Sequence, residues 1–161
     1  MNGTNMGVST ASGKSAGRQE KFNASITHIV SALDELQHLI DTVSLESLEA
    51  PSREERIRSG LAILGRAKVG FATVIKCLYD AHCDIRKCRT ESAEFLIKSR
   101  VLPAPGEDHW PAMYREKAVE RESAEAQLIA EHQSYNSGSA GLIERLQAVE
   151  AQFIVWRKIG E

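Results

Sequence analysis

Cysteine and histidine are the residues whose types and spacing first suggest chemistry in this sequence of 161 residues. Cys77, Cys83 and Cys88 lie within twelve residues, and His82 lies among them. Thiolates and imidazoles are ligands that zinc prefers. On one helix, however, Cys77 and Cys88 would lie about 16 Å apart along the axis, and Cys83 would point in another direction. We therefore expect no metal site, and we interpret Cys88 as a core residue and Cys83 as a free thiol.

A second pattern suggests a metal site of another kind. Glu35 and His38 have the Glu-x-x-His spacing of carboxylate-bridged di-iron bundles. Such a site needs two of these motifs facing each other, and only one is present. His38 also falls opposite the apolar face of its segment, so we expect it at the surface.

A third pattern concerns phosphate. Residues 13–15 read Gly-Lys-Ser, like the end of a phosphate-binding loop, but Val8 stands where the earlier glycine is required and no apolar strand precedes it. Such a loop binds phosphate between a strand and a helix. The sequence also offers no combination of Ser, His and Asp that can be placed together. We therefore expect no enzyme, no cofactor and no small-molecule ligand.

The longest periodic segment covers residues 52–102 and predicts one long helix. Apolar or small residues recur at the first and fourth positions of successive heptads, which is the pattern of a packed helix. Those positions hold Ile57, Leu64, Phe71, Leu78, Ile85 and Ser92, and Gly60, Ala67, Val74, Ala81, Cys88 and Phe95. Leu61, Ile75 and Leu96 widen this face.

The ends of this helix have sequence signals of their own. Ser52 and Glu55 have the spacing of a capping box, and Pro103 would end the helix. Gly60, Gly65 and Gly70 each cost about 1 kcal/mol relative to alanine in a helix, so they either permit a close neighbour or mark a bend. We expect the helix to be continuous.

Three further helices are predicted around it. Residues 22–43 carry a regular apolar face, residues 111–133 have helix-forming composition but a poor apolar face, and residues 142–159 are apolar again. Residues 134–141, rich in Ser and Gly, are predicted to be a loop. Residues 1–20 contain almost no large apolar side chain, so we expect a flexible tail before a domain of residues 21–161.

The predicted segments differ in their balance of acidic and basic residues. Residues 22–50 carry five acids and no Lys or Arg, residues 52–102 carry eleven bases and six acids, and residues 103–161 carry ten acids and six bases. We expect the basic helix to lie between the acidic ones, with charge selecting an antiparallel register. The sequence thus predicts an all-α protein, an elongated three- to four-helix antiparallel bundle or coiled-coil hairpin around one long central helix.

Composition also bears on compartment and function. The odd number of cysteines, three, and the lack of a long apolar run favour a reducing, cytoplasmic setting with no membrane span. The end of the chain is apolar nearly all round, so Phe153, Val155, Trp156 and Ile159 are expected to bind a protein partner or a second subunit. Trp110, next to Pro111, is a second candidate. The leading hypothesis is a non-enzymatic helical adaptor or assembly subunit.

Two alternatives come from other classes. Arg86, Lys87 and Arg89 could contact phosphates in a nucleic-acid-associated regulator or packaging factor. Their angles around the helix differ and acids lie among them, so ion pairing is favoured over nucleic-acid binding. The polar tail, poor in acids, suggests instead an exported bacterial effector, translocator or secretion-apparatus component.

Overall fold

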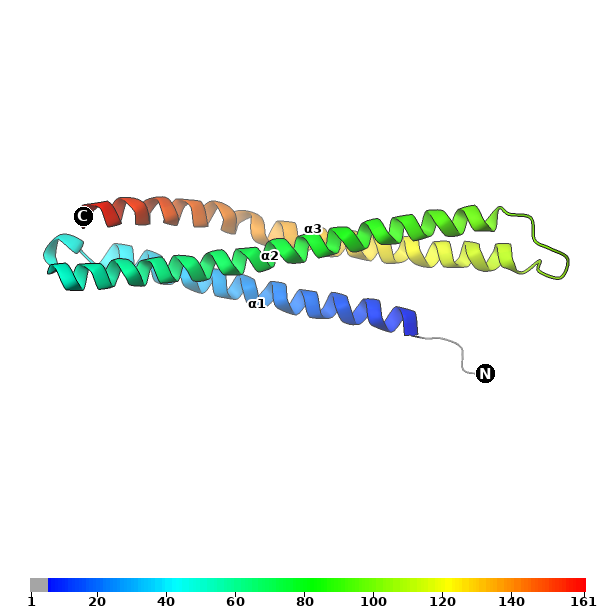
Figure 1. Cartoon of the computed structure of the whole chain (residues 1–161), viewed down its shortest axis with the longest axis horizontal. Helices are drawn as coiled ribbons and strands as arrows, with labels where there is room; N and C mark the ends of the chain where they lie inside the picture. The colour runs from blue at the N-terminus through cyan, green and yellow to red at the C-terminus, as the bar shows by residue number, and fades with distance from the viewer. Residues whose placement is uncertain (1–5) are drawn as a thin grey trace. The chain divides into compact units, whose positions relative to one another are not determined.

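Three long helices make up nearly all of the chain. The computed structural model describes residues 6–161, with side chains from Gly13 onward. The helices are α1 (Met6–Thr42), α2 (Ala50–Ser99) and α3 (Trp110–Ile159), and a short 3-10 helix, η1 (Leu45–Ser47), joins α1 to α2 (Figure 1). Residues 6–161 contain no strand, which confirms the all-α prediction.

The contacts divide the chain into two units. Unit 1 consists of Met1–Cys77 and Ser137–Glu161, and it therefore contains α1, the first half of α2 and the end of α3. Unit 2 consists of Leu78–Asn136, in which the rest of α2 and the start of α3 form a hairpin. Each is a helical unit with buried side chains of its own.

The core of unit 1 comes from one face of each helix. Apolar side chains three or four residues apart are removed from water, which is the main source of stability for such helices. The buried apolar residues of unit 1 are Phe22, Ile29, Ala32, Leu33, Leu36, Leu39 and Leu45, then Ile63, Leu64, Ala67, Phe71, Val74 and Cys77, and finally Val149, Phe153 and Trp156. The heptad positions of α2 are thus mostly buried. Leu61 and Ile75, expected to widen this face, are 45% and 61% exposed.

Two glycines of α2 let its neighbours come close. A Cβ atom on Gly60 would lie 2.9 Å from Cζ of Phe153 in α3, and one on Gly70 would lie 2.7 Å from Cγ1 of Ile29 in α1. Both distances are too short for real Cβ contacts, whereas a Cβ on Gly65 would meet nothing within 4 Å. The helix is continuous through all three positions, so two of them serve packing.

This difference predicts opposite effects for the same substitution. Gly65→Ala should raise the free energy of unfolding by up to about 1 kcal/mol, because alanine favours the helix and meets no obstacle. Gly60→Ala should lower it by about 1 kcal/mol or more, because overpacking against the buried Phe153 ring outweighs that gain. Urea midpoints of both variants would check this, and a stabilised Gly60→Ala protein would contradict the close packing.

The predicted loop at residues 134–141 is wrong, because α3 passes through it without a break. Ser139 is only 2% exposed, and a Cβ on Gly138 would lie 3.3 Å from Cζ of Phe22. Small residues here allow α3 to lie close to α1, and the burial gained outweighs their low helix propensity. The predicted third and fourth helices are therefore one helix, and the chain has three long helices in residues 6–161.

Two helix starts also differ from expectation. α2 begins at Ala50, and the amide of Arg53 already donates to the carbonyl oxygen of Glu49 at 2.9 Å. Ser52 therefore lies inside the first turn and does not cap the helix. α1 begins at Met6, so residues 6–20 of the expected tail are helical, while residues 1–5 lie outside the described chain.

Candidate partner-binding surface

A set of polar bonds fixes the end of unit 1. The guanidinium group of Arg53 donates to three carbonyl oxygens, those of Leu45 at 3.1 Å, Leu48 at 3.0 Å and Gly160 at 3.0 Å. The indole Nε1 of Trp156 donates to the carbonyl oxygen of Val43 at 2.8 Å. These bonds join the segment between α1 and α2 to the last turn of α3. The end of α3 is therefore held in a defined position against α1.

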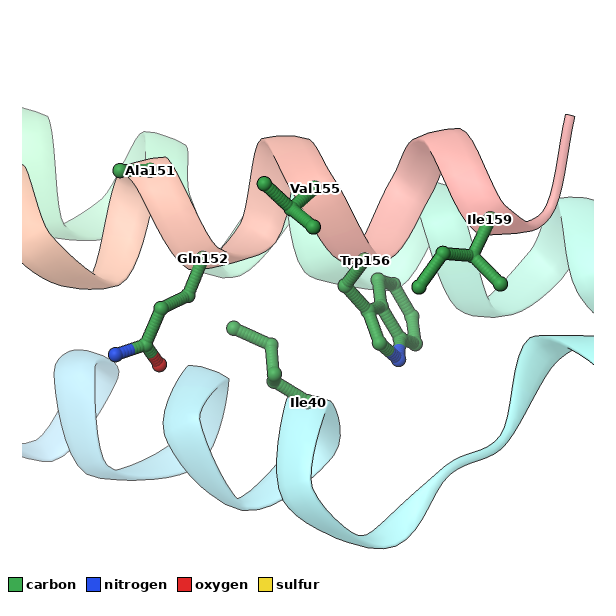
Figure 2. Close-up of a pocket in the computed structure, with 6 residues that line it drawn as sticks. All are labelled: Ile40, Ala151, Gln152, Val155, Trp156 and Ile159. Atoms are coloured by element: carbon green, nitrogen blue, oxygen red, sulfur yellow. The ribbon is translucent and has the colours of Figure 1, made fainter.

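Beside this end lies an apolar groove between α1 and α3, here called the α1–α3 groove. It has a volume of about 460 Å³ and is lined by Ile40, Ala151, Gln152, Val155, Trp156 and Ile159. Figure 2 shows that Ile40 comes from α1 and that Ile40 and Trp156 extend into the space between the two helices. The amide of Gln152 accepts a hydrogen bond of 2.9 Å from Nε2 of Gln37.

The predicted partner-binding residues divide between the core and the surface. Phe153 and Trp156 are 1% and 7% exposed, so the chain's own helices cover most of both side chains. Val155 and Ile159 are 62% and 54% exposed. Because Phe153 faces Gly60 of α2, only Val155, Trp156 and Ile159 meet at the α1–α3 groove.

Trp110 lies elsewhere, at the start of α3 in unit 2. Its indole stacks on the rings of His109 and Tyr114, with centroid distances of 5.2 Å and 5.9 Å. Its exposed fraction is 37%. Trp110 thus packs on its own first turn and belongs to an aromatic cluster separate from the groove residues.

Ion pairs in unit 1 connect the basic α2 to both acidic helices. Nη2 of Arg66 lies 2.6 Å from Oε2 of Glu35 in α1, and Nζ of Lys68 lies 2.5 Å from Oε1 of Glu150 in α3. Arg145 of α3 pairs with Asp34 of α1. Within unit 1, α2 thus forms ion pairs with both neighbours, and α1 and α3 also pair directly with each other. These pairs are exposed and contribute little to stability.

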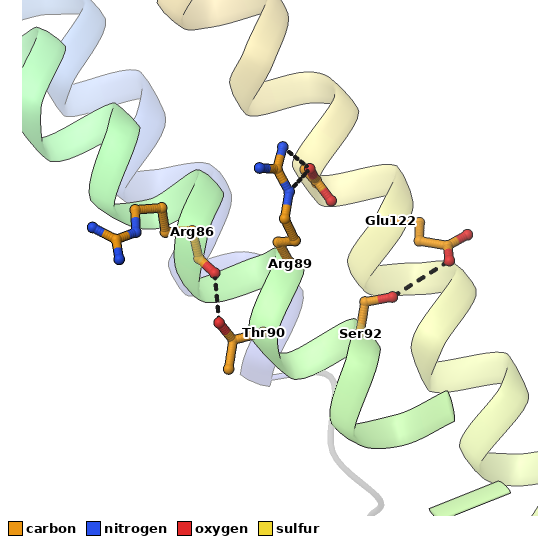
Figure 3. Close-up of polar contacts among 6 residues, drawn as sticks. Arg86, Arg89, Thr90, Ser92 and Glu122 are labelled. Atoms are coloured by element: carbon orange, nitrogen blue, oxygen red, sulfur yellow. Dashed lines mark hydrogen bonds and ion pairs between the residues drawn. The ribbon is translucent and has the colours of Figure 1, made fainter. Parts of the chain in front are cut away.

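The three bases considered for nucleic acid lie in unit 2, and two of them pair with acids. Nη2 of Arg89 lies 2.7 Å from Oε1 of Glu125, and Nζ of Lys87 lies 3.9 Å from Oε1 of Glu91. The carbonyl oxygen of Arg86 accepts a bond from the hydroxyl of Thr90 (Figure 3). This arrangement favours ion pairing over phosphate binding at these residues.

Unit 2 also contains a buried polar contact. The hydroxyl of Ser92, which is 5% exposed, lies 3.4 Å from both the carbonyl oxygen of Ala118 and Oε1 of Glu122 (Figure 3). Ser92 stands at the first position of its heptad, which larger apolar residues occupy in the earlier heptads of α2. These contacts give the Ser92 hydroxyl hydrogen-bond partners, and without a partner its burial would cost free energy.

The three cysteines do not come together at one site. Cys77 and Cys88 are buried and Cys83 is exposed, all as free thiols. Burial is the main cause that raises the pKa of Cys88, which is confirmed as a core residue. Among the described side chains, no three of the types His, Cys, Asp and Glu are placed to hold a metal ion. His38 is exposed, as its position predicts.

The sequence alone identified only part of the groove. Ile40 belongs to the apolar face predicted for residues 22–43, and Ala151 and Gln152 are neither large nor charged, so periodicity alone does not place them at a groove. In the sequence, Arg53 is one of the eleven bases of residues 52–102. No local pattern could show that its guanidinium binds three carbonyl groups, because one of them is 107 residues away.

Neither a membrane-spanning helix nor a related protein is found for this chain within the described residues and the sequence comparisons. No helix in the described part is both long and apolar enough to cross a membrane. The sequence matches no protein-family model, and it has no significant match among curated proteins or solved structures.

Proposed function

We propose that this protein is a non-enzymatic helical adaptor or assembly subunit whose α1–α3 groove binds a helix of another polypeptide. In this proposal the three helices of unit 1 form an antiparallel bundle that presents the groove. Its function is to hold another polypeptide in a fixed place, without a chemical reaction.

The observation that carries this proposal is the exposure of large apolar side chains beside the groove. Val155 and Ile159 remain more than half exposed next to the partly accessible Trp156. Apolar groups so exposed gain free energy when a partner covers them. An aromatic side chain at the base of a groove with aliphatic residues around it is also typical of the centre of an interface.

The residues that line the groove favour a polypeptide partner over a polar small molecule. Gln152 is the only lining residue with a polar side-chain amide, and its oxygen already accepts a bond from Gln37. An amphipathic helix needs only an apolar groove between two helices, and its own backbone bonds are satisfied internally. A polar small molecule would find few groups here to replace its bonds to water.

The hydrogen bonds that Arg53 and Trp156 donate also support partner binding at the groove. They fix the last turn of α3, which carries Ile159, before any partner arrives. A groove already in its binding conformation loses little entropy when it is occupied.

A single substitution tests this proposal. Val155→Glu should leave the helical content and the melting temperature nearly unchanged, because the side chain is mostly exposed. It should remove the chain from any assembly, because a carboxylate would then be buried against apolar groups. The measurement is the size of the native complex that contains the tagged chain, by size exclusion of a gently lysed native extract. Val119→Glu is the matched control, because Val119 is a 63% exposed valine of the same helix in unit 2.

The outcomes are distinct. We expect wild type and Val119→Glu to elute in the same assembly and Val155→Glu to elute as a single chain. Elution of Val155→Glu with the wild-type assembly would show that the groove is not the contact surface.

A further inference from the structure

We infer that the partner in the α1–α3 groove is a second copy of this chain, bound with its α3 antiparallel to the first. This inference rests on the proposed function, since it names the occupant of the same groove. In the symmetric arrangement, α1 and α3 of each copy form a layer of four helices, and each α3 lies in the groove of the other copy.

The shape of the exposed face of α3 favours an antiparallel second copy. At 100° per residue, Ala148, Ala151, Val155 and Ile159 fall within about 80° of the helix circumference. All four are exposed. The face is small at Ala148 and Ala151 and large at Val155 and Ile159. When two copies run in opposite directions and meet at Ala151, Val155 of each copy lies within one residue of the level of Ala148 of the other, so a large side chain faces a small one.

The charges on α3 favour the same arrangement. Glu144 and Lys158 are exposed on the same side of α3, and neither forms an ion pair with another described residue. They stand seven residues before and seven residues after Ala151. When two antiparallel helices meet at Ala151, Glu144 of each copy lies opposite Lys158 of the other.

The parallel arrangement gives the opposite result. Glu144 would face the same glutamate, and Lys158 would face the same lysine, so both contacts would be repulsive. Charge and side-chain size therefore select the same orientation.

The size of the face sets the strength of the dimer. From Glu144 to Ile159 the face is roughly 23 Å long, and with the flank of α1 two copies would bury on the order of 1,000 Å² in total. Interfaces of this size are at the low end of specific protein–protein contacts. We therefore expect a dimer that forms and dissociates with concentration.

Charge reversal tests the orientation directly. Glu144→Lys places lysine opposite Lys158, and Lys158→Glu places glutamate opposite Glu144, each twice in the symmetric dimer. Each single variant should raise the dimer dissociation constant about tenfold or more at low salt. A mixture of the two variants should dimerise again, because each repulsive pair becomes an attractive one. The measurement is sedimentation equilibrium of the purified full chain over a wide concentration range.

The controls separate this effect from a general effect of charge or folding. Glu120→Lys reverses an exposed acid of α3 in unit 2 and should leave the dissociation constant unchanged. The double variant Glu144→Lys with Lys158→Glu should dimerise like wild type, which a simple folding defect would not permit. Melting temperatures of all variants should agree closely.

Two results would overturn the inference. One is a wild-type chain that stays monomeric at every concentration. The other is a dimer that neither single charge reversal weakens. If such a chain still loses a different protein partner on Val155→Glu, the proposed function stands and only the occupant is wrong. If Val155→Glu changes no assembly at all, the proposed function fails as well.

Discussion

Phe153→Ala is expected to lower the free energy of unfolding by about 3–5 kcal/mol, which is the usual cost of removing a large buried aromatic side chain. Phe153 is 1% exposed, its ring fills the space left by Gly60, and it lies beside Trp156 with a centroid distance of 5.7 Å. The substitution leaves a cavity between α2 and α3 beside Gly60. Denaturation by urea, followed by circular dichroism, measures the loss.

Its neighbour provides the control. Ile154 is 46% exposed, so Ile154→Ala should cost less than about 1 kcal/mol. The interaction of Phe153 with Gly60 can also be isolated. Combining Gly60→Ala with Phe153→Leu should cost less than the sum of the two single effects, because the smaller side chain leaves room for the added methyl group. Additive costs would show that the two residues do not share a packing site.

Arg53→Ala is expected to lower the free energy of unfolding by on the order of 3 kcal/mol. Its guanidinium group makes three hydrogen bonds to carbonyl oxygens, and hydrogen bonds of charged groups contribute about 1.5–3 kcal/mol each, with losses that do not add in full. The loss should be largest in the segment between α1 and α2 and in the last turn of α3. Hydrogen exchange of residues 43–49 and 156–161 would locate it.

Two variants make this expectation specific. Arg53→Lys keeps the charge but cannot donate in three fixed directions, so it should recover only a minor part of the loss. Arg58→Ala removes an exposed base of the same helix, for which no bond to another described residue exists, and should change stability by less than about 0.5 kcal/mol. Equal effects of Arg53→Ala and Arg58→Ala would contradict the role given to these three bonds.

Much of the helical structure could be predicted from periodicity. The heptad positions of α2 from Gly60 to Ser92 are nearly all buried, and so are Phe22, Ile29, Leu33 and Leu36 of α1. Apolar spacing predicts burial well because a helix can bury only one side against its neighbours. The apolar end of α3 likewise predicts that Phe153 and Trp156 are covered.

Residues 134–141 show where composition misleads. Ser and Gly are typical of loops in isolation, yet here their small size lets α3 approach Phe22 of α1. A sequence pattern cannot distinguish a small residue that breaks a helix from one that permits a close neighbour. The same ambiguity applied to Gly60, Gly65 and Gly70, and only the contacts of each position separate them.

The groove could be predicted only in part, for a related reason. Its residues come from α1 and from the end of α3, and Ile40 and Ile159 are far apart in the sequence. Periodicity assigns a residue to a side of its own helix but does not say which neighbouring helix covers it. For this reason the sequence grouped Phe153 with Val155, although the first lies against α2 and the second lies at the surface.

Both the proposed function and the proposed dimer require that a polypeptide occupies the α1–α3 groove. A photoreactive phenylalanine analogue placed at position 155 of the full chain tests this most directly, with the same residue at position 119 as the control. Irradiation in native cells should give a protein adduct from position 155 and none from position 119, and mass spectrometry of the adduct should find a second copy of this chain. Equal labelling at both positions, or no protein adduct from position 155, would contradict the assignment of the groove as the assembly surface.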